Sequence, residues 1–277
     1  MNKHASFIEL NARQRAKLLL DEGSYHELLG PFDRIGSPWL EPQGIVPQAD
    51  DGMVIAKGTI DGCTTVVAAI EGNFQGGSMG EVSGAKMASA IELAAEDNRN
   101  GIETQIVLLL ETGGVRLQEA NLGLAAIADI HAAIVDARRY VPVIGVIAGT
   151  VGCFGGMSIA AGLCSKLIVT REARLGLNGP QVIEQEAGIS EYDSRDRPFI
   201  WSMTGGEVRV ATGLADKLVE DSQSEIKSAV KAMIEAGVPS IHRSERYSDY
   251  LALFAGYDGQ QIDGNSARQL FQQEKSE

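Results

Sequence analysis

One stretch of the chain, residues 106–120 (IVLLLETGGVRLQEA), constrains its fold more than any other. The apolar run Ile106–Leu110 is too short for a helix and is followed by paired glycines, so it predicts a strand that is buried on both faces. Beyond Thr112–Gly114, apolar residues recur at helical spacing from Val115 onward. The stretch therefore predicts a strand, a glycine turn and a helix whose N-terminal N–H groups are unpaired.

The same pattern recurs further along the chain. Val141–Ile147 predicts a second buried strand, Ala148–Gly156 (AGTVGCFGG) a second glycine turn, and Met157–Leu163 a second helix. Two neighbouring strands of this kind place two sets of N–H donors at one edge of a sheet, where they can bind a developing oxyanion. Glycine after a buried strand often serves only tight turning or close packing, but its recurrence in both turns favours a functional role.

Composition limits the function classes. Of the 277 residues, 44% are hydrophobic, which is enough for a sizeable core. The net charge of −13 argues against binding to nucleic acid or to anionic membrane surfaces. No run of eighteen apolar residues and no secretory leader is present, so we expect a soluble, cytoplasmic protein.

The remaining segments complete an α/β pattern. Further strands are predicted at Met53–Ile60, Cys63–Ile70, Lys166–Thr170, Leu175–Pro180 and Ala215–Glu220. Further helices are predicted within Asn11–Leu29 and at Ala85–Asn100 (capped by Ser83), Val182–Ala187, Gly206–Gly213 and Ser222–Ala236. The successive strand–turn–helix units favour a parallel ββα superhelix over an ordinary open sheet. We expect an N-terminal helix and arm (1–52), a core (53–240) and a helical tail (241–277), with no low-complexity linker between them.

The three cysteines show no spacing typical of a metal site, and none is predicted. We expect Cys63 and Cys164 to be small core residues. Cys153 lies in the second glycine turn and could be a nucleophile, but the sequence places no histidine near it. A nucleophilic role for Cys153 is therefore a minor alternative.

Several segments together carry a family resemblance. They are Arg15–Glu27 (RAKLLLDEGSYHE), Gly76–Gly84 (GGSMGEVSG), Thr112–Glu119 (TGGVRLQE), Gly149–Ala160 and Gly179–Gln185 (GPQVIEQ). In their order and spacing, the chain resembles the carboxyltransferase branch of the crotonase superfamily, most closely the β subunits of malonate decarboxylases. The resemblance implies the crotonase-like ββα superhelix and an acyl thioester substrate whose enolate is held in an oxyanion hole.

The resemblance also implies site residues. The backbone N–H groups of Gly113, Gly114, Gly155 and Gly156 would be the catalytic donors. We expect the substrate to contact the glycine-rich loop and the residues that flank the two turns, namely Gly76, Gly77, Ser78, Thr112, Val115, Cys153 and Phe154. The loop residues could instead only shape the chain before the following helix.

The partners and the reaction follow from the same resemblance. A homologous γ subunit would complete a carbon–carbon lyase that decarboxylates a malonyl group, and an acyl-transferase α subunit would belong to the same complex. The malonyl group would be carried on the CoA-derived arm of an acyl carrier protein, so this chain itself would bind no cofactor. Three departures from related subunits stand out: no zinc ribbon, no biotin attachment segment, and Gln181 where their motif has arginine.

Two alternative functions and the roles of several further charged residues are left open by the sequence. A transferase that moves the carboxyl group to a biotin protein, or a non-catalytic partner subunit, remains open. Glu111, Glu119 or water could protonate the enolate. We expect Arg116 and Glu119 to form a surface pair, and His131 to be packed and hydrogen-bonded. Arg195 and Arg197 are read by default as solvated charges, with contact to a carrier protein as the alternative.

Overall fold

The strands pair in the same order in which they occur along the chain. The structure, a computed structural model, describes residues 6–47 and 52–274. Its sheet consists of β1 (His26–Leu29), β2 (Met53–Ile60), β3 (Cys63–Ile70), β4 (Gln105–Leu109), β5 (Val143–Ile147), β6 (Lys166–Thr170) and β7 (Lys217–Val219). β2 is antiparallel to both of its neighbours, β1 and β3, and β3 to β7 run parallel.

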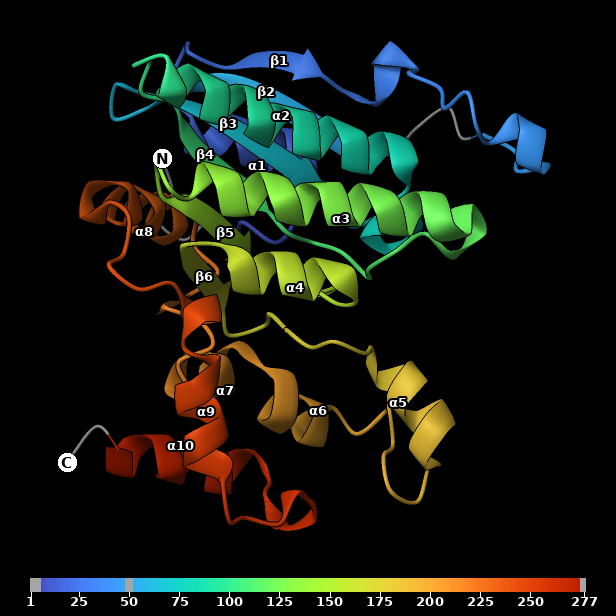
Figure 1. The fold of residues 1–277 in the computed structure, drawn as a ribbon, viewed down its shortest axis with the longest axis vertical. Helices are drawn as coiled ribbons and strands as arrows, with labels where there is room; N and C mark the ends of the chain where they lie inside the picture. The colour runs from blue at the N-terminus through green and yellow to red at the C-terminus, as the bar shows by residue number, and fades with distance from the viewer. Residues whose placement is uncertain (1–5, 48–51, 275–277) are drawn as a thin grey trace.

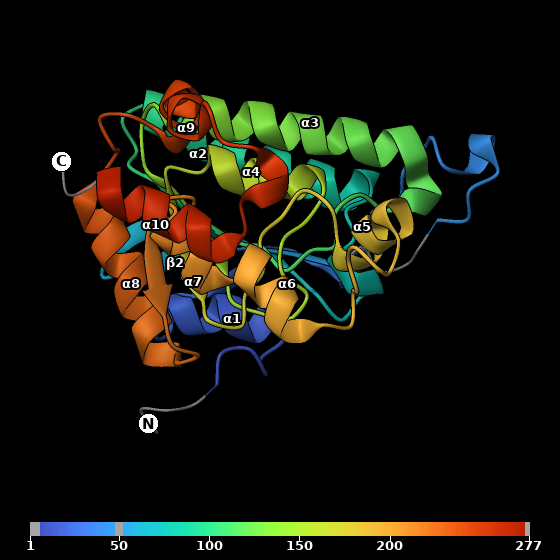
Figure 2. The same cartoon turned by 90° about the horizontal axis from the view of Figure 1, so that it is seen from below.

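Helices cover both faces of this sheet. The connecting helices α2 (Glu81–Arg99), α3 (Ala120–Ala137) and α4 (Gly156–Leu163) lie side by side on one face, and α1 (Ala12–Leu19) and α8 (Gln223–Ala236) cover the other (Figures 1 and 2). Each crossover from β3 to β6 advances by one strand and returns its helix to the same face, because such crossovers share one hand. The chain therefore winds as a strand–helix superhelix.

The remaining helices lie beyond the β6 and β7 edge of the sheet (Figure 1). They are α5 (Pro180–Ala187), α6 (Arg197–Thr204), α7 (Gly206–Ala211), α9 (Tyr247–Phe254) and α10 (Gly264–Glu274). Short 3₁₀ turns occur at Pro31–Asp33, Glu41–Gln43, Gln75–Gly77, Leu117–Glu119, Arg243–Glu245 and Gly259–Gln261.

The core forms two apolar layers, one on each face of the sheet. On the α2–α4 side, Ile127, Ile130 and Ile134 of α3 pack with residues of the central strands. The segment Leu117–Ala137 is long and apolar enough to cross a membrane by length and composition alone, with a mean hydropathy of 1.3. Its isoleucines instead contribute to the core of this fold. On the opposite side, α1 and α8 bury a second apolar cluster.

Register decides where the two glycine turns lie. Ile106 of β4 pairs with Val143 of β5, and the pairing continues in parallel to Leu109 and Val146. Both strands therefore end at the same edge of the sheet, and the turn that follows each strand starts from neighbouring positions. The predicted parallel arrangement of these two strands is confirmed.

The structure corrects several local predictions. The helix predicted within Asn11–Leu29 ends at Leu19 and is followed by β1, an edge strand that the sequence pattern did not reveal. No strand forms at Leu175–Pro180, where Leu175 makes one isolated bridge, to Cys153. Ser83 is not the N-cap of α2: it lies at the third helical position and accepts a hydrogen bond from Gly80 N, 2.9 Å, and Gly80 is the cap.

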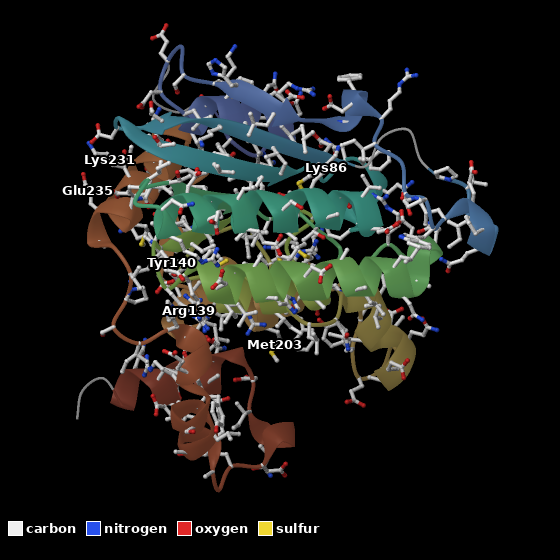
Figure 3. The ribbon with its side chains drawn as sticks, turned by 45° about the horizontal axis from the view of Figure 1, so that its top comes forward. Lys86, Arg139, Tyr140, Met203, Lys231 and Glu235 are labelled. Atoms are coloured by element: carbon white, nitrogen blue, oxygen red, sulfur yellow. The ribbon has the colours of Figure 1, made fainter. Side chains whose placement is uncertain are left out.

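The N-terminal segment is tied to the helical layer by a lysine. Lys86 of α2 is 4% exposed and donates from Nζ to Gly30 O at 2.9 Å. Its position between α2 and the N-terminal strands is visible in Figure 3. Because a buried ammonium group is costly without hydrogen bonds, this contact fixes the segment that follows β1 against α2.

Candidate active site

The two glycine turns lie directly against each other. Thr112 N donates to Gly152 O at 2.8 Å, and Phe154 N donates to Thr112 O at 3.0 Å. A Cβ placed on Gly114 would lie 3.2 Å from Gly155 Cα, so the two backbones are in close contact. The juxtaposition predicted from the two strand–turn–helix units is confirmed.

Three of the four glycine amides predicted as oxyanion donors are already hydrogen-bonded. Gly113 N donates to Gly76 O at 2.8 Å, Gly114 N to Thr112 Oγ1 at 3.0 Å, and Gly155 N to Leu177 O at 2.8 Å. In this arrangement these amides hold the turns together and are not available to a ligand. The assignment of Gly113, Gly114 and Gly155 as donors is corrected on this ground.

Two other backbone N–H groups at the junction of the two glycine turns are available to bind a ligand. Gly156 is the first residue of α4, so its N–H lacks an intrahelical acceptor, and no acceptor is found for it among residues 6–47 and 52–274. Met79 N donates to Gly114 O and Arg116 N donates to Met79 O, so Val115 N turns away from Met79 and also has no acceptor in the described chain. A Cβ on Gly155 would lie 3.8 Å from Val115 N. The available donors are therefore Val115 and Gly156.

The conformation of the turns requires glycine at two positions. Gly114 has φ +108°, and Gly155 has φ 60° with ψ −147°. Both lie in the region of positive φ that residues with a Cβ rarely adopt. A side chain at Gly114 would also press against Gly155 and Phe154 O, each 3.2 Å from its Cβ. The glycines shape the turns so that the next residue in each chain segment can present its N–H.

The side chain of His131, a residue of α3, contacts the start of α4. This half-buried side chain of α3 places Nε2 2.8 Å from Gly156 O, so the histidine was correctly expected to be hydrogen-bonded. A ring N–H that donates to this carbonyl fixes the peptide that begins α4. The neighbouring amide of Gly156 is thereby held in a defined orientation.

The glycine-rich loop supports the first turn. Gly76 supplies the acceptor for Gly113 N, and a Cβ on Gly77 would lie 2.0 Å from Glu111 O. Ser78 O accepts from Arg116 Nη2 at 2.9 Å. These contacts give Gly76, Gly77 and Ser78 a supporting role next to the available amides, and their predicted contact with substrate stays a prediction.

Arg116 and Glu119 form a buried pair, and the expectation of a surface pair is wrong. Arg116 Nη1 lies 3.0 Å from Glu119 Oε1, with side-chain exposures of 4% and 5%. Glu119 Oε2 also accepts from Glu81 N at 2.7 Å, and the guanidinium of Arg116 lies 5.4 Å from the ring centre of Phe74. The 3₁₀ turn at Leu117–Glu119 delays the start of α3 and folds the pair inward. The pair links the first turn to the start of α2.

Glu111 links the second turn to another element, as the Arg116–Glu119 pair does for the first turn. Its carboxylate accepts from Val151 N at 2.6 Å and lies 3.1 Å from Arg15 Nη1 of α1. A Cβ on Gly149 would lie 1.5 Å from Glu111 Oε2, so only glycine leaves room for this carboxylate. Glu111, like Glu119, accepts from amide and guanidinium groups, so the oxygens of both carboxylates are already engaged in supporting the turns. We therefore do not assign the proton of the enolate to either residue.

The burial of the three cysteines differs in part from the prediction. Cys63 is exposed, because it opens β3 at the hairpin, and its prediction as a core residue is wrong. Cys164 is buried, as predicted. Cys153 is also buried, with Sγ 3.2 Å from Met157 O, and burial raises the pKa of its thiol well above the ordinary value. A thiolate nucleophile is disfavoured at this position.

A cavity of about 790 Å³ lies beside the second turn. Its lining residues come from the second turn, from the connection that follows β6, from α5, from the segment between α5 and α6, and from α6: Thr150, Arg171, Glu172, Arg174, Gln181, Ser194, Arg197, Pro198, Ile200 and Trp201. Arg174 donates from Nη2 to Thr150 O at 2.6 Å, and its guanidinium lies over the Phe154 ring at 5.5 Å. The sequence interpretation missed this cavity because it treated Arg197 as a solvated charge and assigned no role to Arg171 or Arg174.

Comparison with known proteins shows the family to which the chain belongs. A family model described as "Carboxyl transferase domain" matches residues 8–244. The chain belongs to the carboxyl transferase domain family. It is 40% identical over 251 residues to the malonyl-S-ACP:biotin-protein carboxyltransferase MADC of Malonomonas rubra, covering 87% of this chain and 79% of that protein.

Solved structures place the chain more closely within the family. It is similar to a chain of a Pseudomonas malonate decarboxylase hetero-tetramer in complex with malonate, with 67% identity, 96% of this chain and 97% of that chain covered, and a TM-score of 0.91. A chain of the Pseudomonas malonate decarboxylase MdcD–MdcE hetero-dimer is 61% identical, with 89% and 95% covered and a TM-score of 0.77. These likenesses confirm the predicted carboxyltransferase branch and its crotonase-like α/β fold.

Proposed function

We propose that the chain is a subunit of a malonate decarboxylase that acts with a homologous partner subunit on a malonyl thioester. The observation that carries this proposal is a pair of neighbouring amides, those of Val115 and Gly156, for which the described residues provide no acceptor. The relatives of the chain include malonate decarboxylase chains. Both relatives with solved structures are members of hetero-oligomers, which supports a partner for this chain.

The amides would act on the thioester oxygen. When the bond between the α-carbon and the carboxylate breaks, CO₂ leaves and its electron pair forms an enolate with its charge largely on that oxygen. Two N–H donors aimed at the oxygen stabilise this charge without a titratable side chain. A proton then adds to the α-carbon and gives the acetyl thioester. This sequence needs no nucleophile, in keeping with a buried, protonated Cys153.

The malonyl group would reach the site on an acyl carrier protein with a CoA-derived arm, and an acyl-transferase subunit would load it. The name of the Malonomonas relative includes a malonyl-S-ACP substrate, which supports a carrier of this kind. The chain itself would contribute the main-chain donors and no cofactor. Its place would be in the cytoplasm.

Carboxyl transfer to a biotin protein is the second candidate function. The 40% identity to a malonyl-S-ACP:biotin-protein carboxyltransferase favours it. The enolate step is common to both reactions, and only the fate of the carboxyl group differs. Supplying free biotin or a biotin protein distinguishes them: direct CO₂ release that is independent of biotin supports decarboxylation, and carboxylated biotin supports transfer.

The role of the amide at Gly156 is tested with two substitutions at one position. Gly156→Pro removes the N–H, and proline is accepted at the first position of a helix. Gly156→Ala keeps the N–H and adds the same Cβ, which would lie 2.8 Å from Ile127 Cγ2 in either variant. In the purified complex, we expect kcat for malonyl-carrier to be about 10²–10³ lower for proline than for alanine. Equal kcat values in the two variants would overturn the oxyanion proposal.

A further inference from the structure

The cavity beside the second turn carries unbalanced positive charge. Of its three arginines, Arg171 is paired with Glu207 and Glu220. Arg174 and Arg197 have no ion-pair partner among the described residues, and Glu172 is the one carboxylate in the lining. Because the whole chain carries a net charge of −13, two unpaired arginines that line one cavity are a local exception to its acidic surface.

The guanidinium group of Arg174 is fixed in position by aromatic rings and backbone carbonyl groups. Its guanidinium is stacked 4.7 Å from the Trp201 ring centre and 5.5 Å from that of Phe154. Nη2 donates to the carbonyls of Thr150 and Val151, while Nε is buried and has no hydrogen-bond partner. Burial lowers the pKa of this guanidinium. The Glu111 carboxylate opposes this lowering, but Arg174 forms no ion pair among the described residues, and a partly desolvated cation of this kind gains from a bound anion.

The cavity lies next to the second glycine turn, which contributes Thr150 to its lining. Arg174 O accepts from Cys153 N at 2.9 Å, so the backbone of Arg174 is paired with the second glycine turn. Phe154, which stacks under the Arg174 guanidinium, immediately precedes the Gly155–Gly156 pair. On the opposite side, Gln181 enters the lining from the first turn of α5. A ligand in the cavity therefore lies next to the residues that position the donors.

We propose that this cavity is a subsite for an oxyanion group of the acyl thioester substrate, an inference that rests on the proposed function. Guanidinium groups bind carboxylate and phosphate through paired N–H donors. The substrate carries both chemistries: the malonyl carboxylate, and the phosphates of the CoA-derived arm. If the carboxylate occupies the subsite, decarboxylation removes the group that is recognised there. The cavity then binds the malonyl substrate in preference to the acetyl product.

The test uses the full chain with the partner subunit that co-purifies. Malonate and inorganic phosphate are titrated separately into the complex by calorimetry at low ionic strength. Arg197→Gln removes one unpaired cation and Gln181→Arg adds one at the same cavity. Arg195→Gln is the matched control, since Arg195 lies on the same segment but is exposed and paired with Asp193.

We expect an anion to bind the wild-type and Arg195→Gln complexes alike. Its dissociation constant should rise about tenfold to a hundredfold in Arg197→Gln, the effect of losing a hydrogen bond to a charged group, and fall in Gln181→Arg. Preference for malonate identifies the acyl carboxylate as the ligand, and preference for phosphate identifies the carrier arm. The absence of binding to wild type, or equal affinity in wild type and Arg197→Gln, overturns the subsite.

Turnover separates this inference from the proposed function. For malonyl-carrier, Arg197→Gln should raise KM by about tenfold or more without an equal fall in kcat. A bound phosphate is present in both the ground state and the transition state, whereas a bound carboxylate loses its charge as CO₂ forms, so in neither case does the subsite stabilise the transition state more than the ground state. If Gly156→Pro and Gly156→Ala turn over equally while Arg197→Gln still loses anion binding, the oxyanion proposal fails and the subsite stands. The reverse result overturns the subsite alone.

Discussion

Arg15 and Glu111, which are 96 residues apart in the sequence, form a buried ion pair with a distance of 3.1 Å between Nη1 and Oε2. Arg15 also donates to the carbonyls of Phe7 and Ile8, so the first helix and the segment before it are bound to the end of the central strand. The same Glu111 carboxylate holds Val151 N. One buried pair therefore joins the N-terminal segment to both glycine turns.

Glu111→Gln should leave the Arg15 guanidinium buried without a counter-charge. Breaking a buried pair in this way costs about 3–5 kcal/mol, and we expect a loss of that order in the free energy of unfolding. Urea denaturation of the purified chain measures it. The double variant Arg15→Met/Glu111→Gln removes the unpaired charge and should recover part of the loss. A loss below about 1 kcal/mol in the single variant would contradict the assignment.

Arg116→Lys should impair turnover, because lysine cannot bind Glu119 Oε1 and Ser78 O together as the Arg116 guanidinium does. We expect kcat to fall about tenfold or more through misplacement of the neighbouring Val115 amide, while KM changes less. Arg139→Lys is the control, since Arg139 is 67% exposed and only loosely paired with Asp136. Equal kcat values for the two variants would show that Arg116 does not position the site.

The three cysteines should react at very different rates. Cys63 is exposed, whereas burial raises the pKa of Cys164 to about 12 and that of Cys153 well above its ordinary value. Iodoacetamide at pH 8 should therefore label Cys63 first in the native chain, as mass spectrometry of tryptic peptides can measure. Denatured protein, in which all three react, is the control. Early labelling of Cys153 in native protein would indicate an accessible thiolate and reopen a nucleophilic role.

Asp21 should make stability depend on pH in acid. Its carboxylate accepts from Gly62 N, Thr59 Oγ1 and Asp61 N at the β2–β3 hairpin, and these hydrogen bonds, that of Gly62 foremost, hold its pKa below the ordinary value of 3.8. Because the folded-state pKa is lower than the unfolded one, the stabilisation is present above pH 3.8 and is lost as the pH falls through the folded pKa.

Asp21→Asn should thus have a lower melting temperature than wild type at pH 7, with the difference narrowing below pH 3.8. Thermal unfolding at several pH values measures both. Asp258→Asn, at an exposed aspartate remote from this hairpin in sequence, is the reference for a general charge effect. A difference that stays constant between pH 7 and pH 3 would contradict the role of the ionised Asp21.

The central part of the fold could be predicted because its signals are local. Ile106–Leu110 and Val141–Ile147 are short apolar runs that end in glycine turns, and they correspond to β4 and β5 within a few residues. β1 could not be predicted in this way. Its residues are exposed, and its place in the sheet depends on antiparallel pairing with β2, which lies far along the chain. Periodicity within a segment does not report such pairing.

The sequence predicted which two turns form the candidate site, but not which of their N–H groups are available to a ligand. The glycines identified where two backbones meet, but the hydrogen bonds of Gly113, Gly114 and Gly155 depend on acceptors from other segments, such as Gly76 and Leu177. Burial of the Arg116–Glu119 pair likewise depends on the 3₁₀ turn and on the loop packed over it. Spacing alone cannot separate a buried pair from an exposed one.

The order of the strands also bears on how the molecule is made. Since β2 to β7 each join the sheet next to the strand synthesised just before, every new strand finds its neighbour already outside the ribosome. Both residues whose amides frame the site, Val115 and Gly156, are translated before β6, β7 and the C-terminal helices. The sheet can thus form strand by strand during translation, from β1 to β7, and the candidate site follows the central strands β4 and β5.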